Sequence, residues 1–259
     1  MKTDLTFRFP LTHAATPREM RKKKIHLYGD GKGSVEYVEH MGSDLSVVNS
    51  ARVSFGVHKK KLNEDDKKLI SYLVKNGHTS TLEHCSITMR LTVPLFVRSQ
   101  HHRHRTWSYN EISRRYTDVD IQFYEPKEFR TQHDSNRQAS NVGDTSDPIV
   151  AWNEKSFPEG GGLPVYASGI TREHHKESMR VYQSLLDAGV CREQARGVLP
   201  QNMYTQYYGT VNLNNLLKFI DLRTHEGAQW EIQKVAEACL EIATELFPIT
   251  VGAYRKERK

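Results

Sequence analysis

Cysteine is scarce in this sequence. The 259 residues include three, Cys85, Cys191 and Cys239, and no two of them are spaced as a CxxC pair. A small, odd number of scattered cysteines excludes a disulfide scaffold and a zinc site built from cysteines. It is typical of a reducing compartment, and we therefore expect a cytoplasmic protein.

Long apolar stretches are also missing. No run approaches the roughly 18 consecutive apolar residues that a membrane-spanning helix needs. Residues 1–24 mix arginine, lysine and proline and lack the apolar core of a signal peptide. The sequence thus predicts neither a membrane span nor a membrane partner.

Glycine-rich phosphate loops are a third absence. Neither GxGxxG nor GxxxxGK occurs, which argues against a Rossmann or P-loop nucleotide site. A phosphate must then be bound by side chains, and arginine suits this because its planar guanidinium makes paired hydrogen bonds to phosphate oxygens. Lysine and arginine total 37 against 31 acidic residues, a net charge of +6 that favours anionic partners. With 37% hydrophobic and 26% charged residues, the composition is that of a folded globular protein.

Hydrophobic patterning divides the chain into three parts. Residues 1–23 are polar and aperiodic, and we interpret them as an N-terminal extension. Residues 24–259 form the predicted domain. Within it, 127–170 is rich in polar residues and contains three consecutive glycines, so we expect a variable excursion with little regular structure.

In the rest of the domain, strands come early and helices late. Residues 25–28 and 34–40 flank a Gly-Asp-Gly turn, which indicates a β-hairpin. Residues 85–93 alternate apolar and polar side chains, the pattern of a strand with one buried face. We also expect a short strand at 121–124 and helices at 44–53, 64–75, 95–104, 171–188, 191–199, 212–223 and 228–246. This order predicts an α+β fold.

The segment 98–116 is unusually dense in polar functional groups. The serine, asparagine and glutamine between its charges differ from the Lys/Glu mixture of an ordinary solvated helix. Its three histidines lack the i, i+4 spacing of a helical zinc site, and we expect no metal there. Its arginines occur together with Trp107, Tyr109 and Tyr116, which also fits a nucleic-acid surface.

Fourteen residues of this segment carry a family signature. Residues 103–116, RHRTWSYNEISRRY, match the pattern RHRxxSxNExSxRY at all nine of its fixed positions. The chain thereby resembles the flavin-dependent thymidylate synthases, over most of 34–125 and 172–250. Residues 1–23 and much of 127–170 lie outside the resemblance.

The resemblance implies an activity and an assembly. Members of that family convert dUMP to dTMP, taking the one-carbon unit from methylenetetrahydrofolate and the hydride from FAD, which NADPH reduces. Their fold is a twisted, mostly antiparallel sheet packed with long helices in a single-domain protomer, similar to the α+β prediction. They are homotetramers with active sites shared between subunits. We therefore expect dUMP and further copies of the chain as partners, and no nucleic acid.

The resemblance also implies which residues bind dUMP. Arg223 matches the family position that activates the uracil ring, and it is the expected catalytic residue. A cation beside the ring favours its electron-rich form, although an arginine at a helix end can instead bond the carbonyls of its own helix. The other expected substrate-binding residues are Gln100, Arg103, Glu111, Ile112, Ser113, Arg114, Arg115 and Arg196.

Within this set, Arg115 and Arg196 are expected to hold the phosphate. We expect Ser113 to form hydrogen bonds, since no base of the Ser–His type lies near it in the sequence. The cysteines lack the Pro-Cys-His context with which the unrelated folate-only thymidylate synthases attack uracil.

A second set is expected to bind FAD: His78, Ser80, Arg103, His104, Arg105, Glu111, Asn212, Asn214 and Lys218. Arg103 and Glu111 belong to both sets, as expected where hydride donor and acceptor stack. His78 is expected near the flavin ring, although it also directly follows the glycine that ends a predicted helix. Asn214 and Lys218 differ from the arginine and asparagine of some relatives.

Two other functions compete with this one. The basic-aromatic segment 98–116 is compatible with a nucleic-acid-binding module. Alternatively, the chain is a flavoprotein of the same fold that acts on another substrate.

Overall fold

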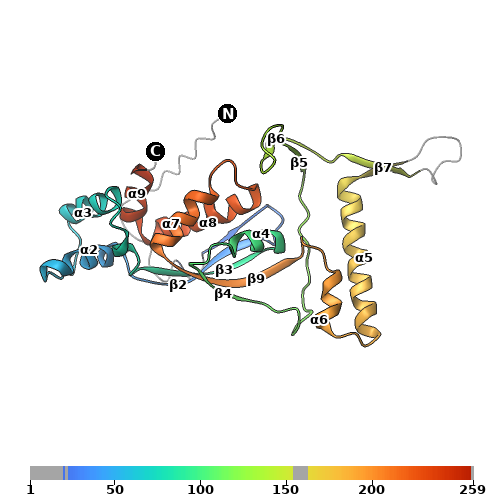
Figure 1. The fold of residues 1–259 in the computed structure, drawn as a ribbon, viewed down its shortest axis with the longest axis horizontal. Coiled ribbons are helices and arrows are strands. Elements are labelled where there is room, and N and C mark those ends of the chain that lie inside the picture. Colours follow the sequence, from blue (N-terminus) through green and yellow to red (C-terminus); the bar gives the residue numbers. More distant parts are fainter. Residues whose placement is uncertain (1–19, 21–22, 154–162, 258–259) are drawn as a thin grey trace.

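The computed structural model describes residues 20, 23–153 and 163–257 (Figure 1). The predicted extension, 1–23, lies outside these residues except for Met20 and Lys23. Met20 is fully buried in the hydrophobic core. The Lys23 ammonium donates to the Glu245 carboxylate at 2.6 Å. The end of the predicted extension therefore packs onto the body of the protein.

A five-stranded sheet forms the centre, in the order β1-β2-β3-β9-β4, and every neighbouring pair is antiparallel. The strands are β1 Lys24–His26, β2 Ser34–Met41, β3 Ser86–Pro94, β4 Ser108–Glu111 and β9 Tyr204–Asn212. β1 and β2 form the predicted hairpin. Its turn contains Gly29 at φ 65° and Gly31 at φ 74°, a left-handed conformation that glycine adopts without strain. The α+β fold with an antiparallel sheet is confirmed.

Helices cover the sheet and close one end of it. α7 (Leu213–Arg223) and α8 (Trp230–Leu246) lie over the sheet, while α2 (Asp44–Arg52), α3 (Glu64–Lys75) and α9 (Pro248–Glu257) gather at one end (Figure 1). Buried apolar side chains of β3, α7 and α8 form one core cluster. Each such side chain contributes about 1.5–3 kcal/mol when buried, so the shared core fixes α7 and α8 over the strands. Within the described residues, no helix combines the length and apolarity needed to cross a membrane.

Two cysteines belong to this core. Cys85 and Cys239 are fully buried, whereas Cys191 is exposed. Burial raises the pKa of the Cys85 thiol to about 11. Cys85 is therefore an inert thiol at neutral pH.

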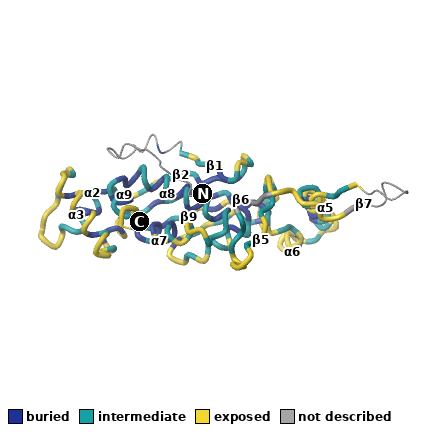
Figure 2. Tube along the Cα trace, turned by 90° about the horizontal axis from the view of Figure 1, so that it is seen from above, coloured by how far each residue is buried: buried dark blue, intermediate teal, exposed yellow. Residues whose placement is uncertain are grey.

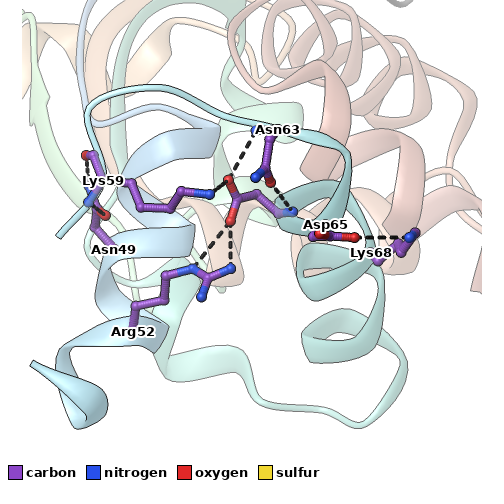
Figure 3. A network of polar contacts seen from close by, with 7 residues as sticks. Asn49, Arg52, Lys59, Asn63, Asp65 and Lys68 are labelled. Carbon is purple, nitrogen blue, oxygen red and sulfur yellow. Dashed lines mark hydrogen bonds and ion pairs between the residues drawn. The ribbon is translucent and has the colours of Figure 1, made fainter. Parts of the chain in front are cut away.

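A buried carboxylate holds the loop between α2 and α3 (Figure 3). The Asp66 side chain is fully buried and accepts hydrogen bonds from Arg52 at 2.7 Å and from Lys59 at 2.5 Å. The Asn63 side chain accepts from the Asp66 N–H and thereby caps α3. Although burial acts to raise the pKa of Asp66, the hydrogen bonds from Lys59 and Arg52 hold that pKa below its ordinary value.

Some predicted helices have different limits. α4 (Leu95–His101) ends before His104, because the chain turns there and the His104 N–H donates to the His101 carbonyl at 2.9 Å. α5 (Ala167–Asp187) begins before Thr171, whose hydroxyl donates to the Ala167 carbonyl at 2.7 Å and caps nothing. The helix predicted at 191–199 shrinks to α6 (Arg192–Ala195) and a 3-10 turn, since glycine and proline follow closely.

The strand predicted at 121–124 is wrong. Phe123 makes a single bridge to Met203, and the Tyr124 N–H donates to the Asn202 carbonyl at 2.8 Å. β4, β9 and α9 were not predicted.

The excursion holds more regular structure than predicted. β5 (Phe129–Gln132) pairs with β6 (Ser140–Ser146), and β7 (Ile149–Asn153) pairs with β8 (Leu163–Tyr166). Together with α5, these pairs form the end of the molecule opposite to α2 and α3, and much of this end is exposed (Figure 2). The expectation of little regular structure in 127–170 is therefore wrong for the described part of this segment, which contains β5 to β8 and the start of α5. Residues 154–162, with the three consecutive glycines, lie outside the described residues.

Candidate active site

The signature 103–116 occupies a turn and an edge strand. α4 ends at His101, the chain turns through 102–107, and 108–111 form β4 at the edge of the sheet. β4 pairs with β9, with Ser108 opposite Thr210 and Glu111 opposite Tyr207. Because β9 runs directly into α7, this pairing connects the signature with the helix that ends at Arg223.

The histidine next to the signature belongs to an aromatic cluster. His101 is fully buried, and its ring packs edge-on against Trp107 with centroids 4.4 Å apart. Its Nδ1 shares a hydrogen bond with the Tyr207 hydroxyl at 2.8 Å. Burial lowers the pKa of His101 well below its ordinary value, so the ring is neutral. In the part of the chain that the structure describes, no three His, Cys, Asp or Glu side chains are grouped to hold a metal ion.

Three predicted residues meet where α4 and α7 end. The Arg223 Nε donates to His104 Nε2 at 3.0 Å, and the Arg223 Nη2 donates to the Gln100 carbonyl oxygen at 3.3 Å. Both acceptors lie outside α7, in and just before the signature, so this part of the chain orients the Arg223 side chain. Burial, and then the charge of Arg223, lower the pKa of His104 to about 4. At neutral pH the imidazole is therefore uncharged, and since Nε2 accepts, its proton lies on Nδ1.

Glu111, expected to touch both ligands, is held by two further residues. The Thr205 hydroxyl donates to Glu111 Oε1 at 2.6 Å. The Arg98 Nε lies 3.3 Å from the same oxygen, an ion pair without hydrogen-bond alignment. These contacts fix the Glu111 carboxylate beside β9.

The two expected phosphate-binding arginines come together at Glu193. The Arg115 Nη2 is 3.4 Å from the Glu193 carboxylate, and the Arg196 Nε donates to the Glu193 backbone carbonyl at 3.3 Å. Both arginines are exposed. Exposed contacts of this kind contribute at most about 1 kcal/mol, so a phosphate can replace them. Ser113 lies in the same turn, and its Oγ accepts the Arg115 N–H at 3.3 Å.

Two residues of the substrate set have other surroundings. The Arg114 side chain is buried and donates to the carbonyls of Val119 at 2.8 Å and Asp120 at 3.5 Å. Its guanidinium therefore stabilises its own loop. Ile112 is 38% exposed, and its N–H extends the pairing of β4 by donating to Gln206 at 2.9 Å.

His78 and Ser80 lie beside the end of α3. Both are exposed, in and next to the 3-10 turn Thr79–Leu82. The His78 ring stacks on Tyr72, with centroids 5.9 Å apart and 18° between the planes. This pair of exposed stacked rings offers a flat face to a planar ligand.

The asparagines of the cofactor set support α7. Asn212 caps this helix by accepting the Asn215 N–H at 2.9 Å. Asn214 is buried and donates to Glu83 Oε1 at 2.9 Å. Lys218, one turn further along α7, is exposed.

The first and third residues of the signature are available for a ligand. Arg103 and Arg105 are exposed. Their side chains make no hydrogen bond or ion pair with any residue that the structure describes. In the part of the chain that the structure describes, Arg223 bonds to His104 and Gln100. It forms no hydrogen bond or ion pair there with Arg115 and Arg196, or with His78 and Tyr72.

Comparison with known proteins decides the family. The family model described as "Thymidylate synthase complementing protein" matches residues 36–249. The flavin-dependent thymidylate synthase of Thermus thermophilus is 40% identical over 225 residues, which make up 87% of this chain and 76% of that protein. The chain belongs to the flavin-dependent thymidylate synthase family. Its relative in Thermotoga neapolitana is 40% identical over 228 residues, 87% of this chain and 92% of that one.

A solved structure is similar to this flavin-dependent thymidylate synthase family chain over most of its length. The UMP/dUMP methylase PolB from Streptomyces cacaoi, bound with 5-Br dUMP, has a TM-score of 0.72 and 31% sequence identity. The similarity covers 90% of this chain and 97% of that one.

Several residues around the flavin-dependent thymidylate synthase signature were missed by sequence reasoning. Thr205 and Gln229 contact Glu111 and Gln100 from other elements. Tyr72 contacts His78 from within α3, and its position one turn before the end of this amphipathic helix carries no functional signal. The family signature alone could not find such residues, because they are neighbours only in the folded chain.

Proposed function

We propose that this chain catalyses the reductive methylation of dUMP to dTMP, with methylenetetrahydrofolate as carbon donor and FAD and NADPH as the source of the hydride. The observation that carries this proposal is the contact of Arg223 with His104 and Gln100. It joins the expected catalytic residue to one residue of each expected ligand set. PolB, described as a UMP/dUMP methylase, supports a pyrimidine nucleotide as substrate.

Arg223 acts in this proposal as a fixed cation. Its Nε and one N–H of Nη2 are used by His104 and Gln100, and a guanidinium has five N–H groups. The remaining N–H groups are available to the uracil ring, whose electron-rich form a nearby cation stabilises. Because His104 is neutral at pH 7, it orients the guanidinium without repelling it.

Arg115 and Arg196 bind the phosphate of dUMP in this proposal. They reach the same residue, Glu193, from two segments of the chain. A dianionic phosphate attracts both cations more strongly than a single exposed carboxylate and a carbonyl do. Ser113, next to them, contributes hydrogen bonds.

The residues of the cofactor set fit a flavin nucleotide. The exposed cations of Arg103, Arg105 and Lys218 suit its phosphates. The stacked rings of His78 and Tyr72 suit its planar ring system. When bound, FAD supplies the hydride-transfer chemistry that protein side chains lack.

The nucleic-acid alternative finds no support in the packing of 98–116. Arg98 is ion-paired with Glu111, and the Arg114 side chain is buried. Trp107 is 5% exposed and packs into the core. A surface that binds single strands needs a continuous series of exposed aromatic faces and cations along a groove. Arg103, Arg105 and Tyr116 are exposed in this segment, but Arg98, Trp107 and Arg114 interrupt the series.

We also propose a homotetramer in which subunits share active sites. Large side chains in the signature and on the neighbouring strand β9 are exposed in the protomer: Ile112 by 38%, Tyr116 by 80% and Tyr208 by 45%. Exposed apolar groups around a site favour its coverage by another chain. Mixing inactive Arg223→Ala and Arg196→Ala subunits should restore activity if each active site takes these residues from different subunits.

The decisive experiment combines an absorbance spectrum with a tritium-release assay. The purified protein should show flavin absorbance that NADPH bleaches, and it should release tritium from dUMP labelled at the ring carbon that gains the methyl group. A protein that binds no FAD after supplementation contradicts the proposal. Release from labelled UMP but not from dUMP would assign a different substrate to the same fold.

A further inference from the structure

A buried carboxylate outside the predicted site connects the excursion with Gln100. Glu231 lies in the first turn of α8 and is 3% exposed. Its two carboxylate oxygens accept from Arg130 at 2.8 and 3.0 Å, from Tyr124 at 3.1 Å and from Gln229 at 2.9 Å. The N-terminus of a helix also favours a negative charge. Glu231 is therefore a fully bonded carboxylate, and it lies outside both sets of residues expected from the family resemblance.

Glu231 determines which way the Gln229 amide faces. Paired with a guanidinium, Glu231 is ionised and only accepts, so the Gln229 group that faces it is the NH2. The Gln229 Oε1 then faces the other way and accepts from the Gln100 Nε2. The Gln100 NH2 is thus directed at Gln229, and its side-chain oxygen is left as an acceptor for a ligand.

The guanidinium that pairs with the Glu231 carboxylate comes from Arg130, in the excursion. Arg130 belongs to β5, and its Nε also donates to the Ser140 hydroxyl at 2.9 Å. Its guanidinium lies over the Trp230 ring, 5.3 Å from the centroid. The side chains of Arg130 and Glu231 are 18% and 4% exposed, so the pair is largely shielded from water. Removing one partner of such a pair leaves an uncompensated charge.

We propose that Glu231 is a positioning residue for substrate binding, which acts through Gln229 to fix the orientation of the Gln100 amide. Arg130 holds Glu231 in place from the excursion. The Gln100 backbone is fixed separately, since its carbonyl accepts from Arg223. This inference rests on the proposed function, which assigns Gln100 to dUMP.

The first test replaces Glu231 by glutamine. A neutral amide at position 231 donates as well as accepts, so Gln229 and Gln100 lose their defined orientation. We expect the KM for dUMP to rise about tenfold, which corresponds to about 1.4 kcal/mol. The kcat should stay within about twofold of wild type and the flavin content should be unchanged, because the change acts on substrate binding alone. A merely structural role would lower flavin content and kcat without this separation.

A double variant tests the direction of the hydrogen bonds. Gln229→Glu combined with Glu231→Gln returns a carboxylate that accepts from the Gln100 NH2, while the amide oxygen at 231 still accepts from Arg130 and Tyr124. The KM for dUMP should return to within about threefold of wild type, since the donor of Gln100 is again specified. Failure of this rescue contradicts the orientation argument.

Gln229→Met is a second, independent variant. It removes the link to Gln100 and leaves Glu231 paired with Arg130, so the protein should fold and the KM for dUMP should rise as in Glu231→Gln. The matched control is Glu177→Gln on the exposed face of α5, where the carboxylate pairs with Arg180 at 2.5 Å. It should leave the KM for dUMP unchanged.

The outcomes separate this inference from the proposed function. If the wild type methylates dUMP and Gln229→Met keeps the wild-type KM, the inference is overturned and the function stands. If the wild type neither binds nor methylates dUMP, the function is overturned, and the inference with it. Should Glu231→Gln fail to fold, Gln229→Met decides alone.

Discussion

Replacing Arg223 by alanine removes the cation on which the proposed chemistry depends. The guanidinium is held by His104 at 3.0 Å and by the Gln100 carbonyl at 3.3 Å, so its remaining N–H groups point in a fixed direction. A hydrogen bond from a charged group contributes about 1.5–3 kcal/mol. Losing one such bond to the reacting uracil lowers kcat/KM by about 10- to 150-fold.

The fold should survive this substitution. Arg223 bonds to a neutral ring and to a carbonyl, and not to a carboxylate, so its removal leaves no buried negative charge unpaired. We therefore expect Arg223→Ala to bind flavin like the wild type. Arg223→Lys keeps the charge but lacks the fork of N–H groups, and its activity should be intermediate.

The assay measures tritium release from labelled dUMP over a range of dUMP concentrations, with flavin absorbance recorded on the same samples. Arg180→Ala is the matched control, because Arg180 is an exposed arginine on α5 that pairs with Glu177. It should behave as the wild type. A loss of less than about twofold in kcat/KM for flavin-loaded Arg223→Ala would refute the reasoning, since a group used in the transition state costs more than that.

Three further predictions concern stability. Asp66→Asn should lower the free energy of unfolding by about 1–3 kcal/mol at pH 7 through loss of its charged hydrogen bonds. Because the folded pKa of Asp66 lies below its ordinary value, urea titrations should show this difference above about pH 4 and its disappearance at lower pH. The pKa of His104 is about 4 against an ordinary 6.5, so between these values the unfolded chain binds a proton that the folded chain does not. The free energy of unfolding should then fall as the pH drops through this window, and it should fall less steeply in His104→Gln. Equal pH slopes in the wild type and the variant would contradict the lowered pKa of His104. In Gly209→Ala, the new Cβ meets the Trp107 ring at 3.1 Å and Leu91 at 3.3 Å, and overpacking of this kind costs about 1–3 kcal/mol, which a thermal melt will detect; an unchanged melting temperature would show that the ring moves freely.

The sequence predicts β3 well but does not predict β9, although buried and more exposed residues alternate along both strands. β9 contains the tyrosines, threonines and valine that favour strands. Gly209 interrupts this pattern, and glycine weakens a strand assignment. The structure explains the glycine, because a Cβ at this position would lie only 3.1 Å from the Trp107 ring. Gly209 is thus explained by its contact with a distant segment, and it weakens the strand pattern of β9 in the sequence.

The site divides in the same way. The signature and Arg223 are recognisable because their residue types and spacing form a fixed pattern. Gln229 and Glu231 are not, since their partners Gln100 and Arg130 lie 129 and 101 residues away in the sequence. Charge and polarity along the chain do not reveal a network that only the packing of α4, α8 and β5 assembles.

The bridge between Phe123 and Met203 has a consequence for insertion and exchange of segments. The Tyr124 N–H donates to the Asn202 carbonyl and the Tyr204 N–H donates to the Gln122 carbonyl, each at 2.8 Å, so the chain leaves the body and returns to it at one place. We call the chain between these two points, residues 125–201, the arm. Because the junction lies outside the arm, we expect a change in the arm's length to leave the register of β3, β9 and β4 unchanged. A shorter arm, or one grafted from a relative, is therefore compatible with the same sheet, provided that it still delivers Arg130 and Arg196.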